Sequence, residues 1–564
     1  MNTLRALASR GGISRRGAAV AVGVIALLLF LPSLSNGFAY DDVPLIQNDA
    51  RVHGLDSVLT ILRTGYWGDG PLGLYRPLTT LSFALDWTLS GGAPAWFHFT
   101  NAALHAAASV LAFLLLCRFF GTGAAFAGAL IFAVHPVHTE AVANVVGRAD
   151  VLSAALVFAA CLVWTTERAS PQWRWSRVGL VAAISGLALL TKESAVMLPS
   201  LILLIDAARG SLRLRGIREY LRREALPFAA MAFVLAACLG VRFLVLNGLA
   251  PSRIDAALEV APSAAGRVAT ALQAWPEYVR LLVFPRTLLA DYGPRVLMPS
   301  VGWTAAAAAG GALLLGSVVG GMMALARRHP RAALGLLWFP IAILPVSNLL
   351  IPIGVVVAER TLYLPSFAIG IGVAGIVAVA AGLLAQVVDG RESTSRMRRR
   401  PAAAAAAAVA VIALLMVRTL DRIPEWESTD TIMLALAEDR PDSFRGAWYL
   451  ARRARARGDA VLAGQRYAQA LHLWPYRKRL VMEAAGFAAE TGNVRHAFDI
   501  ARFAVDTWPD DVGAQRLLAG SALDLGDTTT ARHAVRAGLE IEPRDALLRR
   551  MDAAIPKPDP MLDR

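Results

Sequence analysis

The sequence predicts an all-α protein in two parts: a polytopic membrane domain of about eleven helices, followed by a C-terminal α-solenoid of short repeats. Two observations predict this fold class. Long apolar runs fill the chain up to about residue 420, and about 20 residues cross a bilayer as a helix. After residue 421 the hydropathy falls and a 34-residue period begins. Because 56% of the 564 residues are apolar, an ordinary soluble enzyme, a disordered protein and a secreted disulfide scaffold are excluded.

The membrane domain is expected to occupy 17–421, after a short leader of 1–16. The first apolar run follows arginines and could pass for a signal peptide. No small-residue cleavage site follows it and ten further runs do, so we interpret it as a membrane anchor. The expected spans, with boundaries loose by several residues, are 17–36, 97–117, 121–136, 148–166, 177–191, 193–207, 226–248, 300–326, 332–352, 363–388 and 401–420.

Arginines mark one side of this membrane domain. They lie in the leader and in every second loop after it, which is the positive-inside pattern. The leader is therefore expected in the cytoplasm, whereas the long loops 37–96 and 249–299 and the C-terminus are expected outside. The net charge of +14 thus reflects the placement of arginines on the cytoplasmic side of the membrane, and no nucleic-acid partner is expected. The basic segments contain Arg5, Arg10, Arg15 and Arg16; Arg168, Arg174 and Arg177; Arg209, Arg213, Arg215, Arg218, Arg222 and Arg223; Arg327, Arg328 and Arg331; and Arg391, Arg396, Arg398, Arg399 and Arg400.

The region 422–564 carries the repeat and is expected to form an extracytoplasmic domain. Three units cover about 444–545, and 428–441 is interpreted as the second helix of a partial unit. A 34-residue period with Gly at the turn and Pro at the unit end is typical of tetratricopeptide repeats, which bind partner segments on a concave face. A purely capping role for the array is the alternative. The columns are Pro441, Pro475, Pro509 and Pro543; Gly458, Gly492 and Gly526; Ala463, Ala497 and Ala531; and Ala451, Ala485 and Ala519.

Asp41 and Asp42 follow the first span directly, at the expected outer rim of the membrane. Two adjacent carboxylates there are consistent with a helix cap or a solvated chain end. The functional interpretation is a general base, with one carboxylate accepting a proton from a hydroxyl nucleophile and the other orienting it. The sequence leaves open which of the two is the base.

His135, His138 and Glu140 surround Pro136 at the end of the third span. Two histidines at this spacing can ligate zinc, but no further His or Cys lies at ligand spacing. The cysteines Cys117, Cys161 and Cys238 are scattered in or beside apolar runs and suggest neither a disulfide framework nor a metal site. We therefore expect a hydrogen-bonded, structural role for the histidines, and neither a metal nor another cofactor.

Four cations are expected on the outer side, where positive charge is otherwise sparse. Arg148 follows the histidine segment and has Asp150 two residues later, so an Arg148–Asp150 ion pair is the alternative to an anion site. Lys192 is the only lysine in the first 420 residues and precedes Glu193. Glu359 and Arg360 lie in the loop before the tenth span, where an ion-paired loop is the alternative. Arg76 lies in an expected interfacial segment of loop 37–96.

This arrangement suits the transfer of a group from a lipid-linked phosphate donor to a hydroxyl. The lipid would lie in the membrane, with its phosphate at the interface against Arg148, Lys192 or Arg360. Cations there stabilise the charge that develops on a leaving phosphate. The remaining site candidates, Arg76, His135, His138, Glu140, Asp150, Glu193 and Glu359, are interpreted as supporting residues.

Five segments also resemble the transmembrane and tetratricopeptide-repeat O-mannosyltransferases, which belong to the GT-C superfamily of membrane glycosyltransferases. The resemblance spans nearly the whole chain, including the order of membrane domain and repeats. Its most specific part is the histidine segment at 135–154. The segments are Asp41-Asp42, YRPLTTLSF at 75–83, HPVHTEAVANVVGRADVLSA at 135–154, TKES at 191–194 and ERTLYLPS at 359–366.

The resemblance implies a GT-C-like membrane fold and a metal-independent, inverting transfer of mannose from a polyprenyl-phosphate-linked donor to protein Ser or Thr. It places the catalytic carboxylate at Asp41-Asp42. The repeat array is shorter than in many family members, which leaves the acceptor open. The Ala- and Arg-rich, Lys-poor composition is typical of a high-GC bacterium, so the expected location is the cytoplasmic (inner) membrane, with the repeats in the periplasm or outside the cell.

Two other function classes remain open. A non-catalytic, membrane-anchored repeat scaffold for envelope proteins has no need of the Asp pair or of the outer cations. A transporter or flippase for lipid-linked sugars requires polar residues on both membrane faces and a site at the midplane. The polar groups of this sequence are expected mainly on the outer face, which favours the glycosyltransferase.

Overall fold

The computed structural model describes residues 13–68, 73–166, 171–212, 216–248, 263–294, 298, 300, 302–353, 355–388 and 395–556. Most of the expected leader and the first part of the loop 249–299 lie outside these ranges, as do Arg168, Arg213, Arg215 and Arg391. In the described ranges every regular element is a helix, and the only β-type pairing is an isolated bridge between Gly65 and Gly68. The predicted all-α membrane fold class is confirmed.

The chain divides into two compact units. The first holds 1–292 and 299–432, and the second holds 293–298 and 433–564. The boundary expected from the sequence lies between residues 421 and 422, about ten residues before the observed one. The difference arises because the turn η11 (Ile423–Glu427) and the first residues of α18 (Thr429–Asp439) pack with the membrane unit. For example, Asn36 donates a hydrogen bond to the backbone oxygen of Ile423.

The long helices of the membrane unit follow the expected spans closely. Each expected span coincides with a helix. These helices are α2 (Arg15–Phe30), α5 (Pro94–Leu116), α6 (Thr122–Val134), α8 (Arg148–Thr165), α9 (Pro171–Thr191), α10 (Leu198–Ala208), α11 (Ile217–Leu246), α14 (Ala305–Ala326), α15 (Pro330–Ile343), α16 (Phe367–Val388) and α17 (Ser395–Arg422). Five helical stretches of the described chain are long and apolar enough to cross a membrane, and a bent pair at α6 and Pro136–Val142 can make a sixth. Three shorter apolar helices add to these. The protein is a multi-pass membrane protein, while the number eleven stays a prediction.

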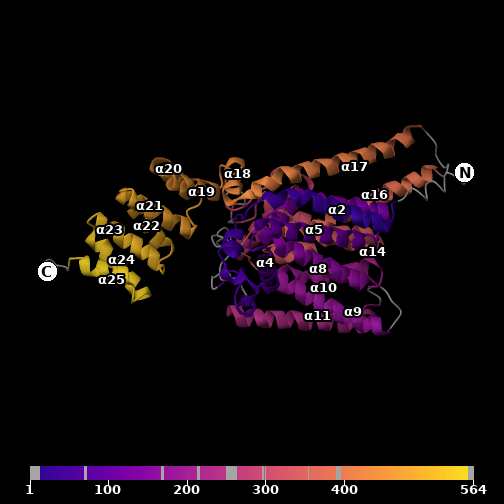
Figure 1. The fold of residues 1–564 in the computed structure, drawn as a ribbon, viewed down its shortest axis with the longest axis horizontal. Coiled ribbons are helices and arrows are strands. Elements are labelled where there is room, and N and C mark those ends of the chain that lie inside the picture. The colour runs from indigo at the N-terminus through magenta and orange to yellow at the C-terminus, as the bar shows by residue number, and fades with distance from the viewer. Residues whose placement is uncertain are drawn as a thin grey trace. The chain divides into compact units, whose positions relative to one another are not determined.

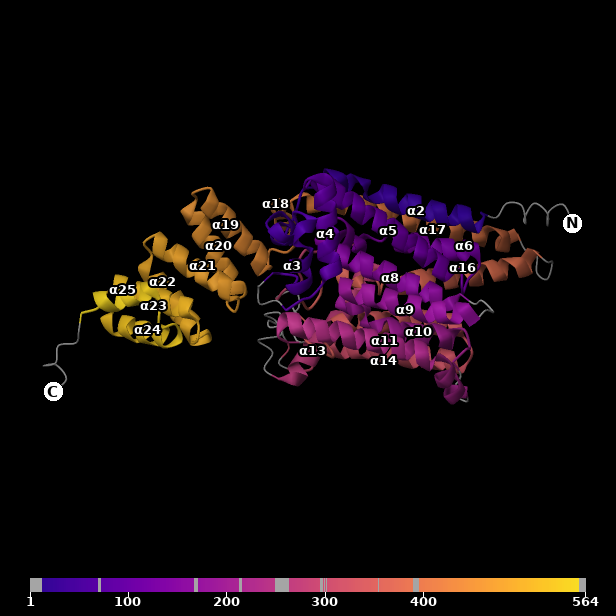
Figure 2. The same cartoon turned by 60° about the horizontal axis from the view of Figure 1, so that its bottom comes forward.

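The long helices of this unit run side by side, and the short elements gather at one end of the bundle (Figures 1 and 2). Helices α3 (Val58–Arg63) and α4 (Pro77–Ser90) lie at this end, opposite the N-terminus of α2. Close backbone contact joins α6 to α16, because a side chain at Gly128 would meet the backbone oxygen of Gly370 at 2.2 Å. Small residues at helix crossings are a common way to pack helices in membranes.

The loops expected outside the membrane contain more helix than the sequence analysis expected. Helix α4 begins at Pro77, and Pro is favoured at the first helical position. Helix α13 (Ala264–Val283) fills much of the described part of 249–299, which was expected only as a long outer loop. Its inner face buries Leu272, Trp275 and Tyr278, while Val279 and Val283 on its other face are exposed. This helix was missed because its apolar residues follow a helical face rather than a continuous run.

The second unit consists of helix pairs at the predicted spacing: α19 (Phe444–Ala456) with α20 (Ala460–Leu473), α21 (Lys478–Glu490) with α22 (Val494–Thr507), and α23 (Val512–Asp524) with α24 (Thr528–Ile541), followed by α25 (Ala546–Ala554). Within each pair a Gly ends the first helix at a φ of 77–79°, a conformation that costs glycine little. The next residue, Asp459, Asn493 or Asp527, accepts a backbone N–H and caps the second helix.

Candidate functional site

Arg360 joins three of the segments that the sequence analysis singled out. It lies in the short turn η10 (Glu359–Leu362), and its Nη1 is 2.9 Å from Oε1 of Glu140 in α7 (Thr139–Val142). The backbone N–H of Arg360 donates to the other oxygen of the same carboxylate at 2.9 Å. Nη1 also lies 3.5 Å from Oδ2 of Asp41. Burial works against the charge on Arg360, but Glu140, Asp41 and Asp150 outweigh it and hold the pKa of the guanidinium above its usual value.

Lys192 forms a second ion pair of the same group. Its Nζ lies 2.5 Å from Oδ1 of Asp150, near the start of α8, and the lysine is 5% exposed. Burial lowers the pKa of Lys192; Asp150 opposes this, whereas the positive charges of Arg76 and Arg360 add to it. The three cations therefore act on one another, and an anion among them would relieve their mutual repulsion.

Glu193 connects two further arginines to the group. Its Oε2 lies 2.9 Å from Nη2 of Arg76, at the start of α4, and its Oε1 lies 3.2 Å from Nη1 of Arg242 in α11. Arg242 also donates to the backbone oxygen of Gly73 at 2.7 Å. Sequence reasoning missed Arg242, although a charged residue inside an apolar run is itself a signal of function. We call this set the Arg360 cluster: Asp41, Arg76, Glu140, Asp150, Lys192, Glu193, Arg242 and Arg360.

The two adjacent aspartates have different surroundings. The side chain of Asp41 is 22% exposed and faces Arg360. Asp42 is fully buried, and its carboxylate accepts backbone N–H groups from Ala39 at 3.2 Å, Val145 at 3.2 Å and Val146 at 2.8 Å. Burial raises the pKa of Asp42 to about 7, against the opposing effect of these hydrogen bonds. Asp42 therefore holds the turn η6 (Val145–Gly147) in place, and Asp41 is the carboxylate that remains accessible.

Gly147 explains why this turn can approach the histidine segment so closely. A side chain there would meet the backbone oxygens of Ala141 at 2.5 Å and Glu140 at 2.6 Å. Any larger residue would therefore push η6 away from α7. The glycine thus helps to place both the Glu140 carboxylate and the start of α8, which carries Asp150.

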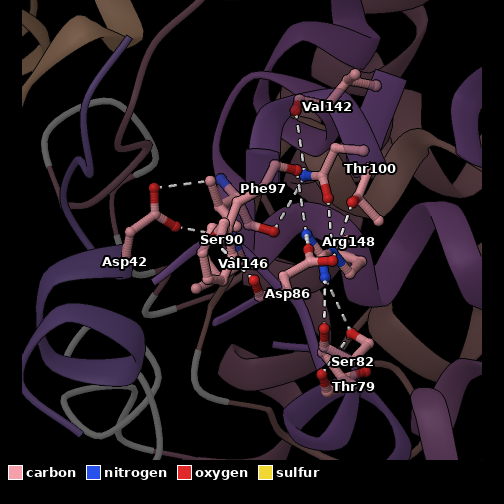
Figure 3. A network of polar contacts seen from close by, with 12 residues as sticks. Asp42, Thr79, Ser82, Asp86, Ser90, Phe97, Thr100, Val142, Val146 and Arg148 are labelled. Atoms are coloured by element: carbon pink, nitrogen blue, oxygen red, sulfur yellow. Dashed lines mark hydrogen bonds and ion pairs between the residues drawn. The ribbon is translucent and has the colours of Figure 1, made fainter. Parts of the chain in front are cut away.

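Arg148 does not fit the predicted phosphate-binding role, and it does not pair with Asp150. It is 0% exposed, and each nitrogen of its guanidinium contacts a protein acceptor (Figure 3). Nη2 lies 2.5 Å from Oδ2 of Asp86, and Nε donates to Oδ1 of Asn101 at 2.7 Å. The other N–H groups reach the backbone oxygen and hydroxyl of Ser82 and the backbone oxygen of Phe97. We call this set the Arg148 network; it engages all three guanidinium nitrogens of Arg148.

The histidines are held by hydrogen bonds. His135 Nε2 lies 3.0 Å from the backbone oxygen of Leu282, and its Nδ1 accepts the N–H of Val137 at 3.2 Å. His138 Nε2 lies 2.8 Å from the hydroxyl of Ser366. Over the described ranges, no three His, Cys, Asp or Glu side chains are grouped so that they could hold a metal ion. The contacts of both histidines connect segments that are far apart in the sequence.

Glu359 is adjacent to Arg360 in sequence but belongs to a separate contact. Its Oε1 accepts the backbone N–H of Leu289 at 2.5 Å and the hydroxyl of Tyr292 at 2.7 Å. The side chain is fully buried, and burial raises its pKa to about 7. The loop is ion-paired, as the alternative expected, but through Arg360 with Glu140 and Asp41 rather than through Glu359.

Tyr66 is a second residue of this region that sequence reasoning missed, since it lies in the loop 37–96, where only Arg76 was singled out. It is 4% exposed, and the guanidinium carbon of Arg76 lies 5.2 Å from its ring centre. The charges of Arg76, Asp41, Arg360 and Asp42 all act on its phenol group. A lone tyrosine in a loop carries no motif, so only the fold reveals its place.

Comparison with known proteins finds that this chain is similar to protein mannosyltransferases. Residues 79–243 match the family model of dolichyl-phosphate-mannose-protein mannosyltransferases. The chain is 27% identical over 438 residues to protein O-mannosyl-transferase TMTC3 of Mus musculus, which covers 72% of this chain and 45% of the relative. It is 33% identical over 292 residues to protein O-mannosyl-transferase Tmtc2 of Drosophila melanogaster, covering 48% of this chain and 30% of the relative. The chain thus spans less than half the length of these relatives.

Among solved structures, the chain is similar to ArnT from Cupriavidus metallidurans. The apo structure aligns with a TM-score of 0.37 and 17% identity, covering 78% of this chain and 80% of ArnT. The structure of ArnT bound to undecaprenyl phosphate aligns with a TM-score of 0.36 and 14% identity, covering 77% and 80%.

Proposed function

We propose that this chain, which belongs to the family of transmembrane and tetratricopeptide-repeat O-mannosyltransferases, transfers a sugar from a polyprenyl-phosphate-linked donor to a hydroxyl group of a protein. Mannose is the leading sugar, because the family model and the named relatives are mannosyltransferases. Serine and threonine are the acceptor side chains that carry an aliphatic hydroxyl. The Arg360 cluster is the site to which we assign the reaction.

The observation that carries this proposal is the accessible carboxylate of Asp41 beside the charge of Arg360. A general base must reach the proton that it removes. Asp41 is 22% exposed and can meet an acceptor hydroxyl, whereas Asp42 is buried and fully occupied by backbone N–H groups. We therefore assign the base to Asp41 and a positioning role to Asp42.

In the proposed step the acceptor oxygen attacks the anomeric carbon of the sugar from the side opposite the phosphate. A new carbon–oxygen bond forms, the bond from the anomeric carbon to the phosphate oxygen breaks, and Asp41 takes the hydroxyl proton. The polyprenyl phosphate leaves with the bonding electron pair, and the configuration at the anomeric carbon inverts. Arg360, Arg76 and Lys192 are assigned to the leaving phosphate, where positive charge stabilises the transition state.

The repeat unit is assigned to the protein acceptor, because stacked helical repeats offer an extended surface for a chain segment. Its first helix pair begins at Phe444, 22 residues after the last membrane helix ends at Arg422. The arginine pattern favours the repeats on the outer side of the membrane. The composition favours a bacterial cytoplasmic membrane, so the donor lipid would be a bacterial polyprenyl phosphate.

Sugar transfer by the purified full-length protein in detergent tests the proposal. Labelled polyprenyl-phosphate-mannose is the first donor, other polyprenyl-phosphate sugars follow, and an extract of envelope proteins is the acceptor. Wild type is run beside Asp41→Asn, with and without a chelator. We expect transfer by wild type in the presence of chelator, and a loss of about a hundredfold or more in Asp41→Asn, the size of general base catalysis.

No transfer by wild type from any of these donors would contradict the enzyme proposal and would favour the membrane-anchored scaffold. Transfer that Asp41→Asn retains in full would leave the enzyme standing but would remove Asp41 as its base. Transfer abolished by the chelator would contradict the metal-independent step.

A further inference from the structure

The hydroxyl of Tyr66 is buried without a hydrogen-bond partner. The residue is 4% exposed, and in the described parts of the chain no group lies in hydrogen-bonding position to its Oη. A buried polar group that makes no hydrogen bond destabilises the fold. Such a group in a native protein calls for an explanation, and a bound ligand is one of the few that apply.

The backbone around Tyr66 is held firmly, so its position does not depend on the hydroxyl. Arg51 donates from Nη2 to the backbone oxygen of Tyr66 at 3.1 Å and from Nη1 to that of Gly65 at 2.8 Å. Asp49 holds the same guanidinium at 2.6 Å. The N–H of Tyr66 donates to the backbone oxygen of Leu74 at 2.7 Å. These contacts fix the backbone at Tyr66, while its hydroxyl has no hydrogen-bond partner in the described part of the chain.

The phenol lies among the cations of the proposed phosphate site. The Arg76 guanidinium lies over its ring, and Arg76 and Arg360 are two of the charges that act on its hydroxyl. Burial raises the pKa of Tyr66, so its hydroxyl stays protonated at neutral pH. A neutral O–H donor beside two cations matches a ligand that only accepts hydrogen bonds and carries negative charge, as a phosphodiester does.

We propose that Tyr66 is a positioning residue whose hydroxyl donates a hydrogen bond to a phosphate oxygen of the lipid-linked donor, between the charges of Arg76 and Arg360. This inference rests on the proposed function and adds a donor that no motif in the sequence indicates. The phosphate is favoured over the acceptor hydroxyl because a cation, Arg76, covers the ring of Tyr66. Tyr66 takes no part in bond making; it orients the phosphate before the sugar transfers.

Tyr66→Phe tests this inference, with Tyr75→Phe as the matched control in the same loop. The hydroxyl of Tyr75 already donates to the backbone oxygen of Leu62 at 2.9 Å. Removing it should lower the unfolding temperature and change donor use little. Removing the unpartnered hydroxyl of Tyr66 should leave the unfolding temperature equal or higher. It should raise the KM for the donor roughly tenfold to a hundredfold, the size of a hydrogen bond to a charged group, and change the acceptor KM little.

Binding of polyprenyl phosphate alone supplies a readout that needs no turnover. We expect this lipid to raise the unfolding temperature of wild type and Tyr75→Phe, and to do so at much higher concentration in Tyr66→Phe. Equal stabilisation of wild type and Tyr66→Phe would overturn the inference and leave the proposed function intact. A rise in the acceptor KM alone would also overturn it, because Tyr66 would then face the acceptor.

A fall in unfolding temperature for Tyr66→Phe as large as that for Tyr75→Phe would show that the hydroxyl has a structural partner, and this too would overturn the inference. Absence of both transfer and lipid binding in wild type is a different result. It would contradict the proposed function itself, so failure of the two proposals can be told apart.

Discussion

The membrane unit holds two networks of buried charge at the same end of the bundle, and they differ in how completely their groups are satisfied. In the Arg148 network each nitrogen of a fully buried guanidinium contacts a protein acceptor, and Asp86 supplies the balancing charge through an ion pair, although its Oδ2 makes no regular hydrogen bond in the described residues. In the Arg360 cluster Asp41 and Arg360 are about a fifth exposed, and the neighbouring Tyr66 hydroxyl has no partner in the described residues. Both networks contain residues of the same sequence segment, 135–154.

The difference shows how to separate structural charge from functional charge. A buried ion pair is costly unless all of its hydrogen bonds are made, and a complete network has no capacity left for a ligand. An incomplete network retains that capacity at some cost in stability, which is typical of functional sites. By this criterion the Arg148 network fixes helices α4, α5 and α8 to one another, and the Arg360 cluster is where substrate binds.

The largest expected effect comes from breaking the Arg148 network. Arg148→Met leaves the Asp86 carboxylate buried without its cation, which costs about 3–5 kcal/mol. We expect little folded protein, or a large fall in unfolding temperature measured in detergent. The double variant Arg148→Met with Asp86→Leu should recover much of the loss. A stable Arg148→Met variant that fails to bind polyprenyl phosphate would instead return Arg148 to the donor site.

A smaller effect is expected within the Arg360 cluster. Lys192→Ala removes one cation near the proposed phosphate and should raise the donor KM about tenfold, in the range of a single charge-assisted hydrogen bond. The acceptor KM should change little. Asp150→Asn is the matched variant, since it removes the partner of Lys192 and keeps the lysine. Unchanged donor kinetics in Lys192→Ala would remove Lys192 from the phosphate site.

The smallest effect concerns pH and the buried carboxyl groups that border the cluster. Burial raises the pKa of Asp42 from 3.8 to about 7 and that of Glu359 from 4.5 to about 7. Between about pH 4 and pH 7 the folded protein therefore binds more protons than the unfolded chain, so the free energy of unfolding falls as pH rises through this window. Unfolding measured from pH 4 to pH 8 should show this decline.

Asp42→Asn and Glu359→Gln should each flatten part of that decline, because neither replacement titrates. Tyr292→Phe, which removes a hydrogen bond to Glu359 without removing the carboxyl group, serves as the control. A stability profile of wild type that rises from pH 4 to pH 7 would contradict the assignment of these two groups as buried acids.

Much of the fold follows from the sequence because its signals are local. Each expected span contains a helix, since a long apolar run can satisfy its backbone in a membrane only as one. The repeat pairs follow from Gly458, Gly492 and Gly526, each with a capping residue after it. Helix α13 was missed because a helix with one apolar face at the bundle surface lacks a continuous apolar run.

The site could be predicted only in part, because its pairings connect distant segments. The sequence indicated that Asp41, Lys192 and Arg360 share the outer face. It left the base undecided between two aspartates, because only the turn at Val145–Val146 distinguishes them. The partner of Arg148 is Asp86, a single carboxylate three residues beyond the YRPLTTLSF segment, which no pattern connects with Arg148. Arg242 and Tyr66 reach the cluster from segments that were interpreted as a membrane span and an interfacial loop.

The most direct test of this account compares Asp41→Asn with Asp42→Asn in one sugar-transfer assay, with unfolding followed on the same samples. We predict that Asp41→Asn loses transfer by about a hundredfold or more at an unchanged unfolding temperature. Asp42→Asn should keep most of the transfer and alter the pH dependence of unfolding instead. The opposite pattern, with transfer lost in Asp42→Asn at unchanged stability and kept in Asp41→Asn, would contradict the claim that the incomplete network performs the chemistry.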